Sequence, residues 1–120
     1  MGALNGLRVL IVEDEMLVSM LLEDMLGDFG CCVVGPASTL REALPLAQTA
    51  DLDAAVLDVN LGGDPIFPVA DALKARGVPF VFASGYGESS LAEAHRGAPV
   101  LQKPFRQADL ERALNALPRA

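Results

Sequence analysis

The sequence predicts an α/β domain, (βα)5, in which a five-stranded parallel sheet is doubly wound with helices on both faces. Three observations support this prediction. Short apolar runs recur along the chain, segments with helical periodicity separate them, and the runs themselves are almost continuously apolar. Continuous apolar character is typical of parallel strands that are buried on both faces, whereas half-exposed strands alternate with polar residues.

Each predicted strand is rich in valine, isoleucine, leucine or phenylalanine. Five βα units are compatible with the flavodoxin-like strand order 2-1-3-4-5, which is a common arrangement of such units. In that order the first and third strands are neighbours, and ligands bind outside the carboxyl ends of the strands. The predicted strands are residues 7–12, 31–35, 54–58, 78–83 and 98–102.

The first two predicted helices rest on periodicity and on a capping signal. Apolar residues of the segment 16–29 recur close to i, i+3, i+4 spacing, which predicts an apolar face for the first helix. Thr39 and Glu42 are spaced as in a capping box that opens the second helix, and Pro45 is expected to bend that helix. The residues expected on the apolar face of the first helix are Leu17, Met20, Leu21, Met25 and Phe29.

Turn and breaker residues define the remaining helices. Asp64 is typical of an N-cap, and Pro65 and Pro68 of first-turn prolines, so the third helix is expected to open there. Helical periodicity also predicts a short fourth helix over residues 88–95 and a fifth over residues 107–117.

Length and composition indicate one domain without a membrane segment. The 120 residues are 52% apolar, so we expect a single domain over residues 1–120 and no effector domain. No apolar stretch approaches the roughly 18 residues needed to span a bilayer. The N-terminus lacks the basic and apolar regions of a signal sequence, so we expect the protein to be cytoplasmic.

The charge balance argues against nucleic-acid binding. Sixteen acids against nine bases give a net charge of −7, which repels a phosphate backbone. A protein partner, or a cation that gathers the acids locally, agrees better with this composition.

Carboxylates stand at the ends of two predicted strands. Asp58 closes the run 54–58 directly before a turn-rich stretch, and Glu13 and Asp14 follow the run 7–12. Carboxylates in such places are costly unless a cation or hydrogen-bond donors meet them. The ligands on offer are oxygens, which favours Mg²⁺.

Two further polar residues are expected at the same edge of the sheet. Ser84 follows the run 78–83 and offers a hydroxyl donor, and Lys103 follows the run 98–102 and offers an ammonium group suited to a phosphoryl oxygen. Together with the carboxylates and a metal they can hold a phosphoryl group. With Asp58 as nucleophile the site can accept that group covalently as an acyl phosphate.

These motifs together resemble a response-regulator receiver domain over essentially the whole chain. The resemblance implies that Asp58 is the phosphoacceptor, that Ser84 binds the phosphoryl group and signals its arrival, and that Lys103 neutralises a phosphoryl oxygen. The family usually has a cis bond before the proline that follows the lysine. The matching motifs are Glu13-Asp14-Glu15, Asp58, Ser84 and Lys103-Pro104-Phe105.

The resemblance also implies how Mg²⁺ is held. Asp14 and Asp58 would bind it directly, Glu13 through water, and Asn60 through its backbone carbonyl.

The chain departs from the usual family pattern at the aromatic switch position. Val100 stands three residues before Lys103, where receivers commonly carry an aromatic residue. The stretch 79–87 is similar to the signature of the "FAT GUY" receiver subgroup, with Ser84 in place of threonine. Tyr86 is therefore a candidate switch residue, and it is about as well explained as a packing residue.

The resemblance implies a phosphoacceptor of bacterial two-component signalling. A histidine kinase or a histidine phosphotransfer protein would donate the phosphoryl group, and phosphorylation would change the surface of the fourth helix, fifth strand and fifth helix for a downstream protein partner. A role as a phosphoryl sink stays equally open. The chain would assist its own phosphorylation and dephosphorylation without being an enzyme.

Two other functions are weighed against this one. A Mg²⁺-dependent phosphohydrolase could use the same aspartyl phosphate, although the expected nucleophile lies on the third strand rather than the first. A receiver-like interaction module would never be phosphorylated, and the complete set of acids, Ser84 and Lys103 argues against it.

Overall fold

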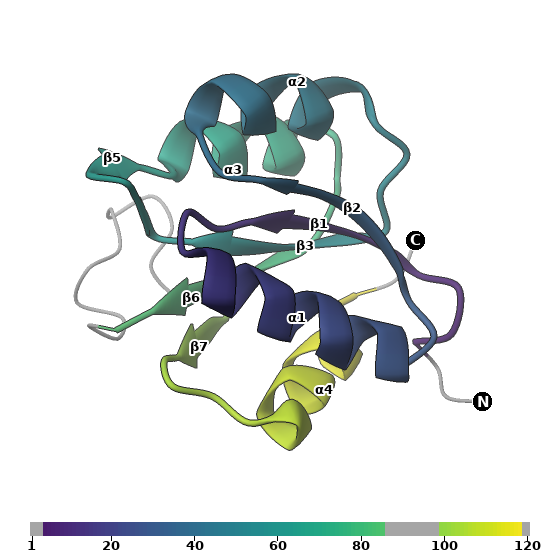
Figure 1. The fold of residues 1–120 in the computed structure, drawn as a ribbon. Helices are drawn as coiled ribbons and strands as arrows, with labels where there is room; N and C mark the ends of the chain where they lie inside the picture. Colours follow the sequence, from purple (N-terminus) through teal and green to yellow (C-terminus); the bar gives the residue numbers. More distant parts are fainter. Residues whose placement is uncertain (1–3, 86–98, 119–120) are drawn as a thin grey trace.

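The computed structural model describes residues 4–85 and 99–118, and Figure 1 shows a central sheet between two layers of helices. The sheet has five parallel strands in the order β2-β1-β3-β6-β7. This order is 2-1-3-4-5 counted along the chain, so the predicted fold class is confirmed. The strands are β1 (Arg8–Val12), β2 (Cys32–Ala37), β3 (Ala54–Asp58), β6 (Phe80–Ser84) and β7 (Val100–Gln102).

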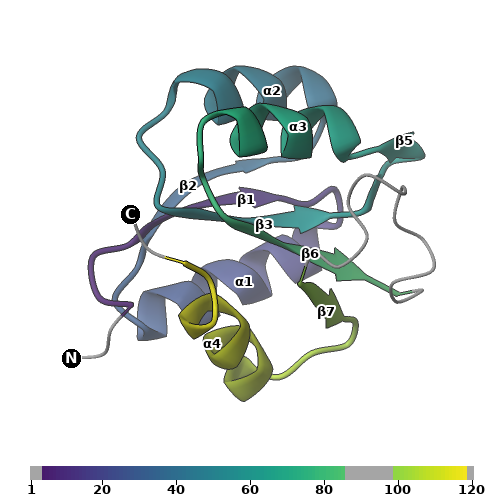
Figure 2. The same ribbon diagram turned by 180° about the vertical axis from the view of Figure 1, so that it is seen from behind.

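Helices cover both faces of this sheet. α1 (Met16–Asp28) and α4 (Gln107–Asn115) lie on one face, and α2 (Leu40–Thr49) and α3 (Phe67–Ala75) lie on the other, as Figures 1 and 2 show from opposite sides. The helix predicted over residues 88–95 lies outside the described residues. Among the described helices, none is both long and apolar enough to cross a bilayer.

The central strand β1 supplies side chains to both cores, which explains its continuous apolar run. Val9 and Ile11 pack in the core under α1 and α4, whereas Leu10 and Val12 pack in the core under α2 and α3. This alternation follows from the two-residue period of a strand. All four side chains are at most 1% exposed.

The predicted apolar face of α1 is wrong in part. Leu17 is 82% exposed, Met20 52% and Leu21 46%, whereas Met25 is buried as predicted. Apolar residues occur around most of this helix, so periodicity alone could not select the side that meets the sheet. The face that packs is formed by Ser19, Leu22, Met25 and Leu26.

The N-cap of the predicted capping box of α2 is confirmed, and the Glu42 side chain reaches back one residue further than predicted, to Ser38. The backbone N–H of Glu42 donates to Thr39 Oγ1 at 3.1 Å, and the Glu42 carboxylate accepts from the backbone N–H of Ser38 at 3.0 Å. Pro45 lies inside α2, and the helix continues past it to Thr49.

The predicted start of the third helix is wrong. Asp64 and Pro65 form a short strand, β5 (Asp64–Pro65), paired antiparallel with β4 (Asn60–Leu61), and α3 begins only at Phe67. The reason is the pair Gly62 and Gly63, whose φ angles of +59° and +95° suit a two-residue hairpin turn. Pro68 falls in the first turn of α3 as predicted.

Candidate functional site

Strand register brings the predicted site residues to one edge of the sheet. Val12 pairs with Leu57, so Glu13 emerges beside Asp58. Asp58 pairs with Ala83 on β6, which places Ser84 one residue beyond it. The backbone N–H of Lys103 donates to the Ser84 carbonyl at 2.9 Å, so Lys103 joins the same edge.

Three carboxylates converge at this edge. Oxygens of Glu13, Asp14 and Asp58 all lie within 4.8 Å of one another. Glu13 and Asp58 are buried, and Asp14 is exposed. Such a group is unfavourable unless positive charge meets it, and an all-oxygen set suits a hard divalent cation such as Mg²⁺.

Lys103 supplies part of that positive charge. Its Nζ lies 2.9 Å from Glu13 Oε1 and 3.4 Å from Asp58 Oδ1. Burial alone would lower the pKa of Lys103, but the hydrogen bond to Glu13 and the attraction of Asp58 outweigh it, so the pKa lies above 10.5. The lysine is therefore charged at neutral pH and stands between the two buried acids. The Lys103–Pro104 peptide bond is cis, as the sequence resemblance implies.

Asp58 is an unusual carboxyl group. Burial raises its pKa from 3.8 to about 7, with further contributions from the hydrogen bond to Asp14 and the repulsion by Glu13. Lys103 acts in the opposite direction because it stabilises the charged form. Near neutral pH, the site without a cation thus keeps a proton on Asp58 for a substantial part of the time, whereas an isolated carboxyl group would be fully ionised.

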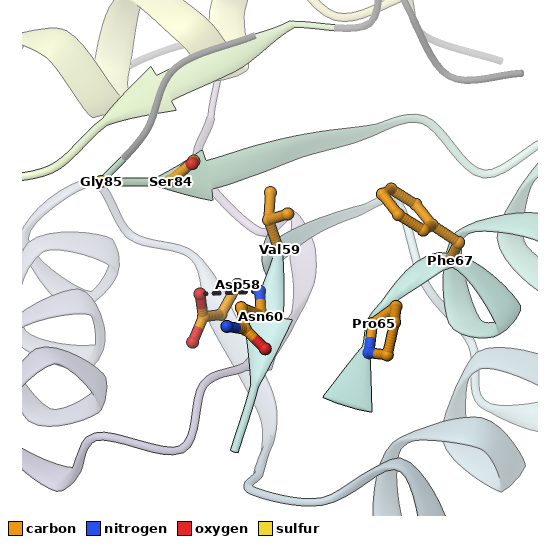
Figure 3. A pocket seen from close by; sticks show the side chains of 7 residues that line it. All are labelled: Asp58, Val59, Asn60, Pro65, Phe67, Ser84 and Gly85. Atoms are coloured by element: carbon orange, nitrogen blue, oxygen red, sulfur yellow. Dashed lines mark hydrogen bonds between the residues drawn. The ribbon is translucent and has the colours of Figure 1, made fainter. Parts of the chain in front are cut away.

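A cavity of about 310 Å³ opens beside Asp58. Figure 3 shows the end of β6, with Ser84, and the side chains of Pro65 and Phe67 around it. Asn60, on β4, donates its backbone N–H to Asp58 Oδ1 at 3.4 Å. Val59, Pro65 and Phe67 give the cavity an apolar wall that the sequence did not indicate.

That wall was missed for a physical reason. Nothing in the sequence distinguishes Val59 from a core residue, and the sequence predicts Pro65 and Phe67 in the first turn of a helix rather than beside the site. Only the β4–β5 hairpin brings Pro65 to the cavity. Of the predicted site residues, Tyr86 lies outside the described part of the chain, and the others meet at this edge of the sheet.

The stability of the site is expected to depend on pH. Without metal, folded Asp58 keeps its proton up to pH of about 7, whereas the unfolded chain loses it near 3.8. Stability from this group is therefore complete at low pH and is lost as pH rises between these values. As pH rises over this range, wild type loses stability relative to Asp58→Asn, whose amide does not titrate. We therefore expect the difference in the free energy of unfolding, variant minus wild type, to grow by about 1–2 kcal/mol. This is less than the full shift in the pKa of Asp58 would give, because the site is open to solvent.

Chemical denaturation at several pH values in the presence of a chelator measures this difference. Asp64→Asn, on the exposed strand β5, is the control and should show a difference that does not change with pH. A flat difference for Asp58→Asn as well would show that the pKa of Asp58 is ordinary. Mg²⁺ added at pH 7 should stabilise wild type more than Asp58→Asn, because it binds the folded carboxylates.

The family model of the response regulator receiver domain matches residues 9–115. The chain belongs to this family. The matched segment runs from β1 to the end of α4 and contains the three carboxylates, Ser84 and Lys103. The protein is thus a receiver domain of the response regulators that act in two-component signalling.

Individual relatives agree with this assignment. The chain is 36% identical over 107 residues to the transcriptional regulatory protein PdtaR of Mycobacterium tuberculosis, and the match covers 86% of this chain and 52% of PdtaR. The chain spans about half the length of the curated relatives that it matches.

Two solved structures are informative. SdrG from Sphingomonas melonis Fr1 is 47% identical with a TM-score of 0.82, covering 97% of this chain and 98% of SdrG. The receiver domain of the sensor histidine kinase PA1611 from Pseudomonas aeruginosa is 25% identical with a TM-score of 0.78, covering 92% and 95%. In that structure a magnesium ion is coordinated in the active-site cleft.

Proposed function

We propose that Asp58 accepts a phosphoryl group from a phosphohistidine, carried by a histidine kinase or a histidine phosphotransfer protein, in a reaction that requires Mg²⁺. One observation carries this proposal. Three carboxylates lie within 4.8 Å of one another, and Lys103 Nζ is placed against the two that are buried. A nucleophile, a cation site and a counter-charge for phosphoryl oxygens are therefore side by side.

The residues present suit Mg²⁺. Asp14, Asp58 and the backbone carbonyl of Asn60 would hold it, and Mg²⁺ bound there would offset the charge of the transferring phosphoryl group. Glu13 would act through water. The contacts of Glu13 support this indirect role, because both of its carboxylate oxygens already have protein partners. Oε1 faces Lys103, and Oε2 accepts the backbone N–H of Glu15 at 3.1 Å.

The chain's own groups have distinct parts in the transfer. A carboxylate oxygen of Asp58 attacks phosphorus in line, the phosphorus–nitrogen bond of the phosphohistidine breaks, and the electron pair leaves with the imidazole. Lys103 and Ser84 donate to phosphoryl oxygens as negative charge builds on them. The chain itself is the acceptor, and water would release the phosphoryl group from Asp58, so we propose a phosphoacceptor that assists its own phosphorylation and dephosphorylation rather than an enzyme.

The output would be a change of surface recognised by a downstream protein. The movement of Ser84 toward the phosphoryl group would bias the following segment together with β7 and α4. Tyr86 is the proposed relay, because Val100 stands where an aromatic residue is usual. Nucleic acid is not expected to be a direct partner at a net charge of −7.

Incubation with acetyl phosphate, with and without Mg²⁺, tests this proposal by intact-mass spectrometry. We expect one added phosphoryl group per chain with Mg²⁺, lost on acid treatment, and no adduct with a chelator. Absence of an adduct under both conditions would instead favour an interaction module. Release of many equivalents of phosphate per chain, from a small phosphoester in excess, would favour a phosphohydrolase.

A further inference from the structure

The β4–β5 hairpin lies between the hydrophobic core and the carboxylate cluster. Of the residues in it and next to it, Val59, Leu61 and Ile66 are 6%, 2% and 0% exposed and pack in the core under α2 and α3. The backbone N–H of Val59 also donates to the Ala83 carbonyl of β6 at 3.1 Å. The hairpin is therefore held to the sheet on one side, which leaves its other side to meet the site.

Two contacts join the hairpin to the carboxylates. The backbone N–H of Asn60 donates to Asp58 Oδ1 at 3.4 Å, which Figure 3 shows as a dashed line. At the turn, a Cβ atom added to Gly62 would lie 3.8 Å from Asp14 Oδ2. The hairpin thus reaches both carboxylates that are expected to bind Mg²⁺ directly.

The pairing of Asn60 with Pro65 decides where the backbone groups of Asn60 point. Pairs in an antiparallel ladder alternate between hydrogen-bonded and non-hydrogen-bonded ones. Pro65 has no N–H, so its pair with Asn60 is of the non-hydrogen-bonded kind. The ladder bond beside this pair runs from the Ile66 N–H to the Val59 carbonyl at 3.1 Å. The N–H and the carbonyl of Asn60 therefore both point out of the hairpin.

This direction is the one that a cation at the carboxylates requires. The N–H and C=O of an extended residue lie on the same side of its strand. Because the Asn60 N–H meets Asp58 Oδ1, the Asn60 carbonyl lies on the side of the carboxylates as well. A register shift of one residue would turn both groups toward the partner strand. The register of the hairpin thus decides whether this carbonyl is available to a cation.

The turn of the hairpin sets that register. Gly62 and Gly63 have φ angles of +59° and +95°, and a type I′ turn requires a positive φ at both central residues. In a hairpin the type and length of the turn fix the pairing. Resting on the proposed function, in which Mg²⁺ binds at the carboxylates, we propose that the Gly62–Gly63 turn is a positioning element of the cation site. It fixes the register that presents the Asn60 carbonyl to Mg²⁺.

Three glycine variants separate positioning from stability. Gly63→Val disturbs the turn through the backbone alone, because a β-branched residue does not adopt a φ of +95° and a Cβ there meets no atom within 4 Å. Gly62→Asn is the conservative variant, since Asn-Gly is a preferred type I′ turn. Gly77→Val is the matched control. Gly77 also has a positive φ, +74°, and room for a Cβ, but it precedes β6 at the opposite edge of the sheet.

Titration of isotopically labelled protein with MgCl₂, followed by NMR, measures the affinity for the cation. In wild type the Asn60 carbonyl carbon should shift as Mg²⁺ binds. We expect the Kd of Gly63→Val for Mg²⁺ to rise at least about tenfold, as when the support of a metal ligand is lost. Gly62→Asn and Gly77→Val should keep the wild-type Kd. Both valine variants should lower the thermal transition, so a loss of affinity in only one of them does not follow from lower stability.

Other results would contradict the positioning role. A wild-type Kd in Gly63→Val would overturn it, and so would an equal loss of affinity in Gly77→Val. Should Gly63→Val fail to fold, wild type itself decides, because Mg²⁺ binding that leaves the Asn60 carbonyl carbon unshifted would also overturn the role. A wild type that binds no Mg²⁺ and forms no adduct with acetyl phosphate would instead count against the proposed function.

Discussion

The variant Asp58→Asn is expected to form no acyl phosphate with any donor, whereas wild type is modified nearly completely with Mg²⁺ and acetyl phosphate. An amide is a far weaker nucleophile than a carboxylate and cannot give the same adduct. The substitution is almost isosteric, so the sheet and its register should persist. The loss of phosphorylation will therefore report chemistry rather than unfolding.

Asp64→Asn is the matched control for this variant. Asp64 is also an aspartate near the site, but it is exposed on β5 and lies outside the carboxylate cluster. It should accept phosphoryl as wild type does. An adduct of wild-type yield on Asp58→Asn would refute Asp58 as the nucleophile, and loss of the adduct in both variants would point to the hairpin instead.

The variant Lys103→Ala is expected to show the second large effect, a slowing of phosphorylation by at least about tenfold, the cost of one lost charge-stabilising donor. The same substitution removes the partner of Glu13, whose side chain is 1% exposed. Removing one member of a buried pair leaves an unpaired charge, so we expect the free energy of unfolding to fall by about 2–4 kcal/mol without metal. Rates with acetyl phosphate and urea denaturation measure the two effects.

Mg²⁺ distinguishes the two roles of Lys103. A cation at the carboxylates replaces part of the missing charge, so it should restore most of the stability of Lys103→Ala but not its rate of phosphorylation. Lys74→Ala, an exposed lysine on α3, is the control and should change neither quantity. A wild-type rate of phosphorylation for Lys103→Ala in the presence of Mg²⁺ would show that Lys103 is structural.

The sequence predicted the sheet because its signal is redundant. Each strand is a continuous apolar run, and helices alternate with the runs, so an error in one boundary does not change the topology. The errors concern α1 and the start of α3. Apolar residues surround α1, so its buried face depends on which side of the helix packs against the strands β1 and β2, and this is a tertiary property.

The hairpin error has a different origin. Asp64 and Pro65 carry a helix-start pattern, but Gly62 and Gly63 favour a tight turn that pairs Pro65 with Asn60. Two local signals competed, and the turn prevailed because it lets Leu61 and Ile66, 2% and 0% exposed, enter the core.

The candidate site was predictable as a set of strand ends. Parallel strands place their carboxyl ends at one edge of the sheet. The sequence alone therefore predicts the proximity of four residues that end or follow strands, namely Glu13, Asp14, Asp58 and Lys103. The ion pairs within the site could not be predicted from the sequence. Lys103 Nζ lies 2.9 Å from Glu13 Oε1, and this contact depends on the conformation of one flexible side chain at the carboxyl edge of the sheet. The apolar wall of the cavity depends on the hairpin and was not foreseen.

Peptide mapping of the adduct tests the central claim most directly. Wild type is phosphorylated with acetyl phosphate and Mg²⁺, reduced with borohydride, which converts an aspartyl phosphate into homoserine, and digested for tandem mass spectrometry. We predict that homoserine appears at position 58 and only when Mg²⁺ is present. Homoserine at Asp14 or Asp64, or at Asp58 independently of Mg²⁺, would contradict the account.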